Sequence, residues 1–178
     1  MNFIETKLHD VYIIEQDLSK DERGSFVKTF QKSKFISKGL DCNFRESYYT
    51  HSKKDVIRGM HFQIPPYEHA KLVTVMQGVM VDVILDCRKN SPTYNKHISI
   101  ELSRENSRSV YIPKGCAHGF GALSQLVIAY YMVTSEYSSK HDQGVRYNSF
   151  DFDWPIKQPI VSGRDDLFLP LRQFISPF

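Results

Sequence analysis

Short apolar runs separated by turn residues follow one another along most of the chain. The clearest pair, 72–76 and 79–85, flanks Gln77-Gly78 and predicts a β-hairpin. Residues 17–23 are polar and predict a turn that ends at Gly24. Further strands or extended segments are predicted at 11–14, 25–30, 44–49, 56–62, 98–102, 109–112 and 126–134.

Helical signals are few. Residues 32–39 form the one modest helix candidate, closed by Gly39 at the expected C-terminal position. The stretch 154–177 is loop-rich, and we expect a short helix near Phe168. Many short strands with almost no helix predict an all-β sandwich or barrel. We find no internal repeat or linker and expect one domain over residues 1–178.

Charge and cysteine content narrow the function classes. The formal net charge is only +3, with no basic block, so we expect no nucleic-acid partner. The N-terminus is charged where a signal peptide needs an apolar run, and no stretch has membrane-spanning length. Cys42, Cys87 and Cys116 show no CxxC spacing and are typical of reduced thiols. We therefore expect a cytoplasmic protein with no membrane partner.

The segment 56–63 contains Arg58, Gly59 and His61. On a regular strand, Arg58 and His61 would lie on opposite faces unless the glycine bends the chain. A glycine inside a strand indicates a bulge or the close approach of a ligand. A single histidine is more often structural than catalytic, so His61 by itself predicts little.

A second segment, 112–120, has the spacing Pro-x-Gly-x-x-His that ends at His118 and resembles cupin barrels. Metal-binding cupins carry a His-x-His pair in the earlier motif, whereas this chain has His61-Phe62-Gln63. Glu68 and His69 lie off the usual spacing. A transition-metal site normally needs three protein ligands, and the sequence offers only His61 and His118. We expect no metal site.

Seven segments in order together resemble the dTDP-4-dehydrorhamnose 3,5-epimerase family. The resemblance extends from about Val11 to Asp165, and it implies a cupin-type jelly-roll β-barrel with a few short helices. Each segment alone is a weak signal, but seven at family-like spacings are hard to produce by chance. The segments are 21–24, 56–63, 70–73, 78–83, 91–94, 102–106 and 112–120.

The resemblance implies a cofactor-free proton transfer next to the ketone of a nucleotide-linked 4-keto-6-deoxy sugar. His61 matches the base, Asp165 the carboxylate that orients it, and Lys71 the cation opposite the enolate oxygen. Asp166, beside Asp165, remains an alternative. A tyrosine returns the proton on the other face. Tyr130 and Tyr131 point to opposite sides of a strand, and the family pattern selects Tyr131.

Contacts to the substrate follow from the same resemblance. Arg23, Arg58 and His118 are expected at the diphosphate and sugar, because guanidinium groups suit phosphate oxygens. Phe26 and Tyr137 are expected around the nucleotide base. Arg164 lies in the matching Ser-Gly-Arg-Asp segment. The family also implies a homodimer in which an N-terminal strand is exchanged, so that Arg23 and Phe26 reach the partner's site.

The base-recognition strand departs from the family pattern. Glu46 stands where a glutamine is common, and Tyr48 where an asparagine is common. A carboxylate only accepts hydrogen bonds, which would favour the amino group of cytosine or guanine over thymine. One hypothesis is therefore a CDP- or GDP-linked sugar. The other is that Glu46 is solvated and thymine is held by stacking.

Several other activities fit the same residues. The nearest is an epimerase that inverts only C3 or only C5. A ketoisomerase would move the carbonyl and yield a 3-keto sugar. A metal-dependent oxygenase is disfavoured by Gln63, and a non-catalytic sugar-binding protein by the retained set of His61, Lys71, Tyr131 and Asp165.

Overall fold

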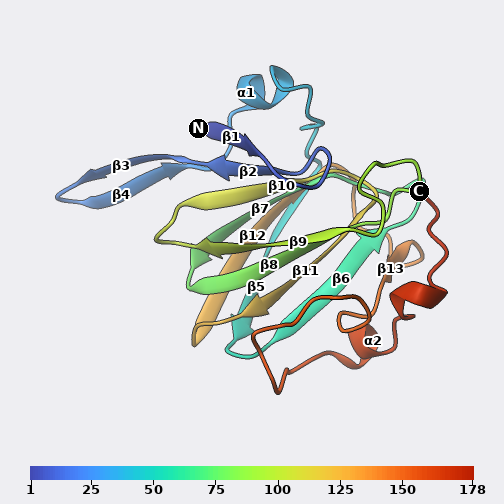
Figure 1. Ribbon diagram of the computed structural model, residues 1–178. Helices are drawn as coiled ribbons and strands as arrows, with labels where there is room; N and C mark the ends of the chain where they lie inside the picture. The colour runs from blue at the N-terminus through green and yellow to red at the C-terminus, as the bar shows by residue number, and fades with distance from the viewer.

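The structure, a computed structural model, describes residues 1–178 and consists mainly of strands wound into a cupin-like jelly roll (Figure 1). The all-β prediction is confirmed. Neither α-helix, α1 (Lys32–Ile36) nor α2 (Gly163–Asp166), is long and apolar enough to span a bilayer. The strands are β1 (Asn2–Glu5), β2 (Tyr12–Glu15), β3 (Asp17–Asp21), β4 (Gly24–Lys28), β5 (Glu46–Lys53), β6 (Ile57–Gln63), β7 (Lys71–Gln77), β8 (Val79–Asp86), β9 (His97–Ser103), β10 (Arg108–Ile112), β11 (Cys116–Ala122), β12 (Leu126–Val133) and β13 (Asp142–Gly144).

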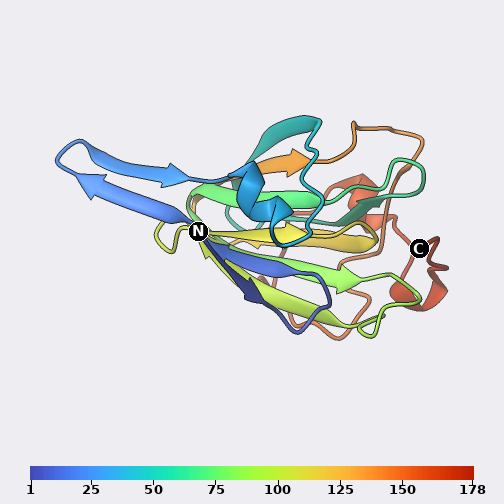
Figure 2. The same ribbon diagram turned by 90° about the horizontal axis from the view of Figure 1, so that it is seen from above.

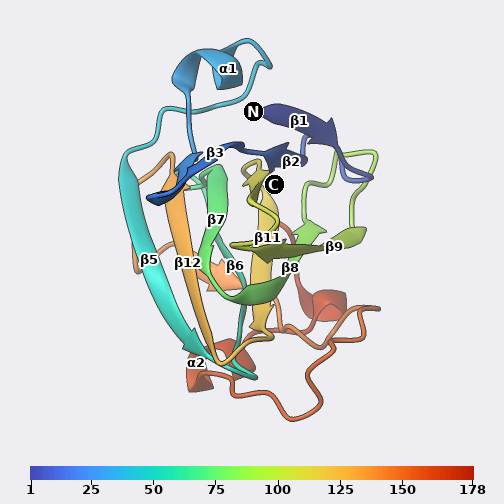
Figure 3. The same cartoon turned by 90° about the vertical axis from the view of Figure 1, so that its left-hand side faces the viewer.

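Two sheets face each other, one ordered β1-β2-β10-β7-β12-β5 and the other β13-β6-β11-β8-β9. In Figure 3, β5, β12 and β7 lie on the left and β11, β8 and β9 on the right. Sixteen buried residues, all but Leu8 and Val11 from the strands of the two sheets, form the core between them and include Val73, Ile84 and Phe120. Along β12 every second residue from Val127 to Val133 is buried, as expected for a strand with one face on the core.

The outer faces of both sheets are also covered in part. Phe35 of α1 packs with Ile14 and Leu72 on the outside of the six-stranded sheet. Trp154 and Ile156 of the C-terminal stretch pack with Val83 on the outside of the other sheet. A strand that is covered on both faces is expected to be almost continuously apolar, which explains why β8 is apolar from Val79 to Leu85 except at Asp82.

The ribbon of β3 and β4 is where the sequence expectation was wrong. Residues 17–23 do not form one turn, because 17–21 pair with β4 and only Glu22 and Arg23 make the turn. The ribbon projects away from the two sheets (Figures 1 and 2), and all five residues of β3 are exposed. A strand that is exposed on both faces needs no alternation of apolar and polar residues. The polar sequence of β3 therefore predicted a turn rather than a strand.

The remaining elements agree with the sequence in most places. Helix α1 lies within the predicted segment 32–39, and Gly39 follows it with φ +71°, a conformation that favours glycine. The C-terminal stretch is loop-rich, with α2 and a 3-10 helix (Leu171–Gln173) on either side of Phe168. Strands β1, β11 and β13 lie where the pattern predicted none.

A bulge in β6 explains how Arg58 and His61 come to face the same way. In β11, His118 pairs with His61 and Phe120 with Arg58, so two steps in β11 match three in β6. The extra residue lies around Gly59, which has φ +135°. Because of this irregularity, Arg58 and His61 both line the same pocket.

Replacing Gly59 by alanine should lower the free energy of unfolding by about 3 kcal/mol, because of backbone strain and overpacking. The new Cβ would lie 2.4 Å from the Cα of Gly119, at a φ that side chains rarely adopt. Gly163→Ala is the control, because its Cβ would meet nothing within 4 Å. Urea unfolding of both variants measures the difference, and equal stabilities would contradict the bulge geometry.

Candidate active site

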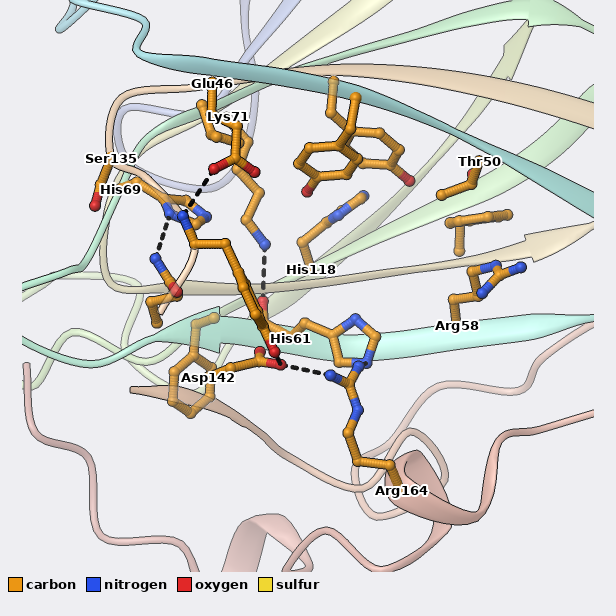
Figure 4. Close-up of a pocket in the computed structure, with 17 residues that line it drawn as sticks. Glu46, Thr50, Arg58, His61, His69, Lys71, His118, Ser135, Asp142 and Arg164 are labelled. Carbon is orange, nitrogen blue, oxygen red and sulfur yellow. Dashed lines mark hydrogen bonds and ion pairs between the residues drawn. The ribbon is translucent and has the colours of Figure 1, made fainter. Parts of the chain in front are cut away.

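The largest concentration of predicted site residues surrounds one pocket of about 340 Å³ (Figure 4). It is lined from both sheets, from the loops that follow β6 and β12, and from α2. Nine of the twelve predicted site residues line it: Glu46, Tyr48, Arg58, His61, Lys71, His118, Tyr131, Tyr137 and Arg164. Asp165 lies just behind His61, whereas Arg23 and Phe26 are on the projecting ribbon.

His61 and Asp165 form a close pair. Asp165 Oδ1 lies 2.9 Å from His61 Nε2, and Asp165 Oδ2 accepts a hydrogen bond from the Gly59 N–H at 3.1 Å. The carboxylate is held at this place because Ser162 caps α2 by accepting a hydrogen bond from the Asp165 N–H. Asp166, the alternative considered from the sequence, is exposed. Of the two candidates, Asp165 is therefore the carboxylate that contacts His61.

Burial and the contact between the two side chains shift the pKa of each residue in opposite directions. Burial lowers the pKa of His61, and the hydrogen bond and negative charge of Asp165 oppose this without cancelling it. Burial would raise the pKa of Asp165, but its hydrogen bonds with His61 and Gly59 outweigh that and hold the pKa well below its usual range. At neutral pH the pair is a neutral imidazole beside a carboxylate, which is the state that a general base requires.

Lys71 begins β7 and points into the pocket from the opposite sheet. Its Nζ donates a hydrogen bond to the His61 carbonyl at 3.0 Å, and the residue is only 6% exposed. Burial lowers its pKa to about 8, although the charges of Asp142 and Asp82 oppose the shift. The ammonium is therefore still the main form at neutral pH, fixed where it can face a developing anion.

Tyr131 is on the core side of β12 and Tyr130 is not among the pocket residues. The Tyr131 ring stacks on that of Tyr48, with centroids 4.8 Å apart and an angle of 14° between the planes. Burial, followed by the neighbouring Tyr48, raises the pKa of Tyr131 well above its ordinary value. A phenol with so high a pKa stays protonated and can donate a proton. Burial also raises the pKa of Tyr48, to about 12.

His118 lines the pocket and pairs with the buried Asp82 behind it, a partner that was not predicted from the sequence. His118 Nε2 is 2.6 Å from Asp82 Oδ1, and Asp82 is completely buried. Burial raises the pKa of Asp82, and the contact with His118 opposes the shift. The signal in the sequence is a single carboxylate inside the apolar run 79–85. Such a residue needs a partner, and His118 supplies it.

Two other pocket residues lay outside the sequence expectation. His69 is a neutral imidazole, because burial lowers its pKa to about 3. Asp142, on β13, lines the same wall and has no distinguishing local pattern. Gln63, the residue that replaces the second histidine of metal cupins, is hydrogen bonded to His69 and to the Ser138 N–H. No group of three or more His, Cys, Asp or Glu side chains is arranged to hold a metal ion.

Arg58, Glu46 and Arg164 are each held by protein partners. Arg58 Nε donates to Ser52 Oγ at 3.0 Å, which leaves its guanidinium at the pocket edge. Glu46 accepts a hydrogen bond from the Tyr137 N–H at 2.8 Å, so this carboxylate fixes the loop that carries Tyr137. Arg164 contacts His61 and Asp142 (Figure 4), and also Asp165.

The pKa shifts predict a bell-shaped dependence of kcat/KM on pH. A base at His61 accepts a proton only when it is neutral, and because the pKa of His61 is below 6.5 the acid limb is expected below that pH. A cation at Lys71 is lost as pH rises through about 8, so activity is expected to fall there. In Lys71→Arg the cation persists, and the alkaline limb should move to higher pH. An unmoved alkaline limb in that variant would show that another group titrates there; ¹³C NMR titration of Lys71 gives its pKa directly.

Comparison with known proteins gives one consistent result. Residues 5–173 match the family model described as dTDP-4-dehydrorhamnose 3,5-epimerase. The protein of that name from Methanothermobacter thermautotrophicus is 40% identical over 176 residues, which is 96% of this chain and 95% of the relative.

Solved structures agree. The Bacillus anthracis enzyme of that name, with TDP and PPi bound, has TM-score 0.92 and 38% identity, covering 96% of this chain and 99% of that one. The Legionella pneumophila dTDP-6-deoxy-D-glucose-3,5-epimerase, in complex with dTDP-4-keto-L-rhamnose, has TM-score 0.93 and 34% identity, covering 98% and 94%. The match runs through every element that builds the pocket. The chain belongs to the dTDP-4-dehydrorhamnose 3,5-epimerase family of carbohydrate epimerases, as the sequence resemblance predicted.

Proposed function

We propose that this protein inverts C3 and C5 of a dTDP-linked 4-keto-6-deoxyhexose. The observation that carries the proposal is the arrangement of three groups in one pocket: the His61–Asp165 pair, the Lys71 ammonium bonded to the His61 carbonyl, and the Tyr131 phenol. Base, cation and acid are what an inversion next to a ketone requires. Residues 1–178 would act as one catalytic domain.

Each inversion is a proton exchange with no change of oxidation state. The 4-ketone acidifies the neighbouring C–H, and neutral His61 takes that proton while Asp165 stabilises the resulting imidazolium. The electron pair moves onto the carbonyl oxygen as an enolate, which Lys71 stabilises. Tyr131 donates a proton to the other face of the same carbon. One C–H bond breaks and one forms, so no redox cofactor is needed.

The nucleotide is proposed to be dTDP, because the matched relatives are named for dTDP sugars. The carboxylate of Glu46 already accepts the Tyr137 N–H, which reduces its availability for an amino group on cytosine or guanine. Arg58 supplies a guanidinium for the diphosphate. Calorimetric titrations with dTDP, CDP and GDP compare the bases. Tightest binding of dTDP supports the assignment, and a preference for CDP or GDP would replace it.

Product NMR tests the reaction itself. Incubation with dTDP-4-keto-6-deoxy-D-glucose should give a sugar with inverted configuration at both C3 and C5 and the ketone still at C4. A 3-keto product would show a ketoisomerase instead. Unchanged substrate with dTDP bound would leave only a sugar-nucleotide binding protein.

We also propose a homodimer that exchanges the β3–β4 ribbon. The ribbon projects from the sheets, and Phe26 on it is 66% exposed (Figures 1 and 2). Arg23 contacts only Asp21 of its own chain and lies outside the pocket. Such a ribbon can serve a neighbour's site but not its own.

The protein is proposed to act in a reducing compartment, the cytoplasm, because its three buried cysteines are free thiols.

A mixing experiment checks the exchange. Arg23→Ala and His61→Gln should each be poorly active alone. After the two are mixed and allowed to exchange subunits, activity should reappear, because a mixed dimer has one site with both His61 and the partner's intact ribbon. Light scattering should give the mass of two chains. A monomeric mass, or no recovery on mixing, would contradict ribbon exchange.

A further inference from the structure

The Nε2 atom of His61 has two competing partners. Asp165 Oδ1 lies 2.9 Å from it, and Arg164 Nη2 lies 2.7 Å from it. Figure 4 shows Arg164 reaching from α2 to this nitrogen, while the other ring nitrogen, Nδ1, points toward the interior of the pocket. The atom that Asp165 would orient is therefore also the atom that Arg164 contacts.

These two contacts require opposite states of the same nitrogen. A guanidinium has only N–H donors and stays protonated, so Nε2 must accept from Arg164. A carboxylate only accepts, so Nε2 must donate to Asp165. In neutral histidine, an accepting Nε2 places the proton on Nδ1, and a donating Nε2 leaves Nδ1 free to take a proton. Only the second tautomer has a base directed into the pocket.

The rest of the network is complete when Arg164 holds His61. Asp165 Oδ1 then accepts from Arg164 Nε at 3.1 Å, and its Oδ2 accepts from the Gly59 N–H at 3.1 Å. The remaining side of the guanidinium is paired with Asp142 of β13. Both oxygens of Asp165, the Arg164 guanidinium and His61 Nε2 have partners in this arrangement, in which His61 is not set as a base.

We propose that Arg164 is a positioning residue that holds His61 with Nδ1 protonated in the empty site, and that a bound diphosphate draws the guanidinium away so that Nε2 passes to Asp165. The proposal rests on the proposed function, because it regulates the base of that reaction. It departs from the expectation that Arg164 simply binds substrate.

The geometry makes a diphosphate the suitable trigger. The Arg164 side chain is half exposed and lines the pocket, whereas Asp142 is 13% exposed and Asp165 is 3% exposed. The guanidinium can therefore move while its two carboxylate partners stay in place. A diphosphate offers several anionic oxygens in a geometry that binds guanidinium bidentately. Once Arg164 leaves, the nearest partner for Nε2 is Asp165, and the base forms only when substrate is present.

Nitrogen NMR of the imidazole rings tests this without turnover. The protein is labelled with ¹⁵N-histidine, and His61→Gln identifies the His61 signals among the seven histidines. In the free wild-type protein we expect protonated Nδ1 and unprotonated Nε2. Saturation with dTDP, or with inorganic pyrophosphate, should reverse the two shifts. In Arg164→Gln the reversed pattern should be present without any ligand.

Two further variants distinguish the effect of Arg164 on the His61 tautomer from a general disturbance of the fold. Arg172→Gln removes an exposed arginine of the 3-10 helix and should leave the wild-type pattern. Arg164→Lys keeps the charge but lacks the planar guanidinium whose Nε, Nη1 and Nη2 contact Asp165, Asp142 and His61 separately, and it should resemble Arg164→Gln. The proposal fails if free wild-type protein already has protonated Nε2, if Arg164→Gln leaves the pattern unchanged, or if saturating dTDP does not reverse it. An inactive protein whose tautomer still follows Arg164 would overturn only the epimerase assignment.

Discussion

His61→Gln should abolish exchange of the C3 and C5 hydrogens with solvent, with kcat/KM lower by about 10²–10⁴-fold. The amide cannot accept and carry a proton, although it fills much of the same space. Asp165 and Lys71 remain in place, because Asp165 is also bonded to the Gly59 N–H and Lys71 to the backbone carbonyl of residue 61. Binding of dTDP should therefore change little, and NMR of the sugar in D₂O measures the loss.

The control for His61 is another histidine outside the pocket. His9 is exposed, pairs with the adjacent Asp10 and does not line the pocket, so His9→Asn should retain wild-type exchange. Persistent exchange at both carbons in His61→Gln would assign the base to another group, and His69 or His118 of the same pocket would be tested next.

Tyr131→Phe should separate exchange from inversion. His61 still removes and returns protons on its own face, so deuterium should enter the substrate at a rate within ~10-fold of wild type. Inverted product should fall by about 10²–10⁴-fold, because no acid remains on the other face. Tyr131 is 4% exposed, so solvent water does not easily take its place. Product NMR in D₂O gives both rates from one sample.

Tyr130→Phe is the matched control for this substitution. It makes the same chemical change one residue away on β12, with the side chain directed away from the pocket. Wild-type rates of exchange and inversion are expected. If Tyr131→Phe inverts both carbons normally, the acid must be sought elsewhere, and Tyr48, stacked on Tyr131, is the nearest phenol.

Much of the barrel could be predicted because its strands bury one or both faces. The alternation in β12 and the apolar run of β8 result from burial against the core and the outer layers. The β3–β4 ribbon is exposed on both sides, so its strands carry no such pattern. Strand β11 contains two glycines and a histidine, and because glycine is typical of turns the sequence did not predict a strand there.

The site was predicted as a list of residues but not as a geometry. The residues selected by family-like spacing, His61, Lys71, Tyr131 and Asp165, lie around one pocket or beside it. The bulge at Gly59 turns Arg58 toward the same pocket, an outcome that regular alternation does not give. The contacts of Arg164 with His61 and Asp142 could not be foreseen, because they join segments that are distant in the sequence and carry no shared pattern.

The measurement that most directly tests the account is positional deuterium incorporation during turnover of dTDP-4-keto-6-deoxy-D-glucose in D₂O. The account predicts deuterium at both C3 and C5, with inverted configuration at both carbons and the ketone retained at C4. Deuterium at one carbon only would show a single-site epimerase. No deuterium at either carbon, with substrate bound, would contradict proton abstraction by His61 altogether.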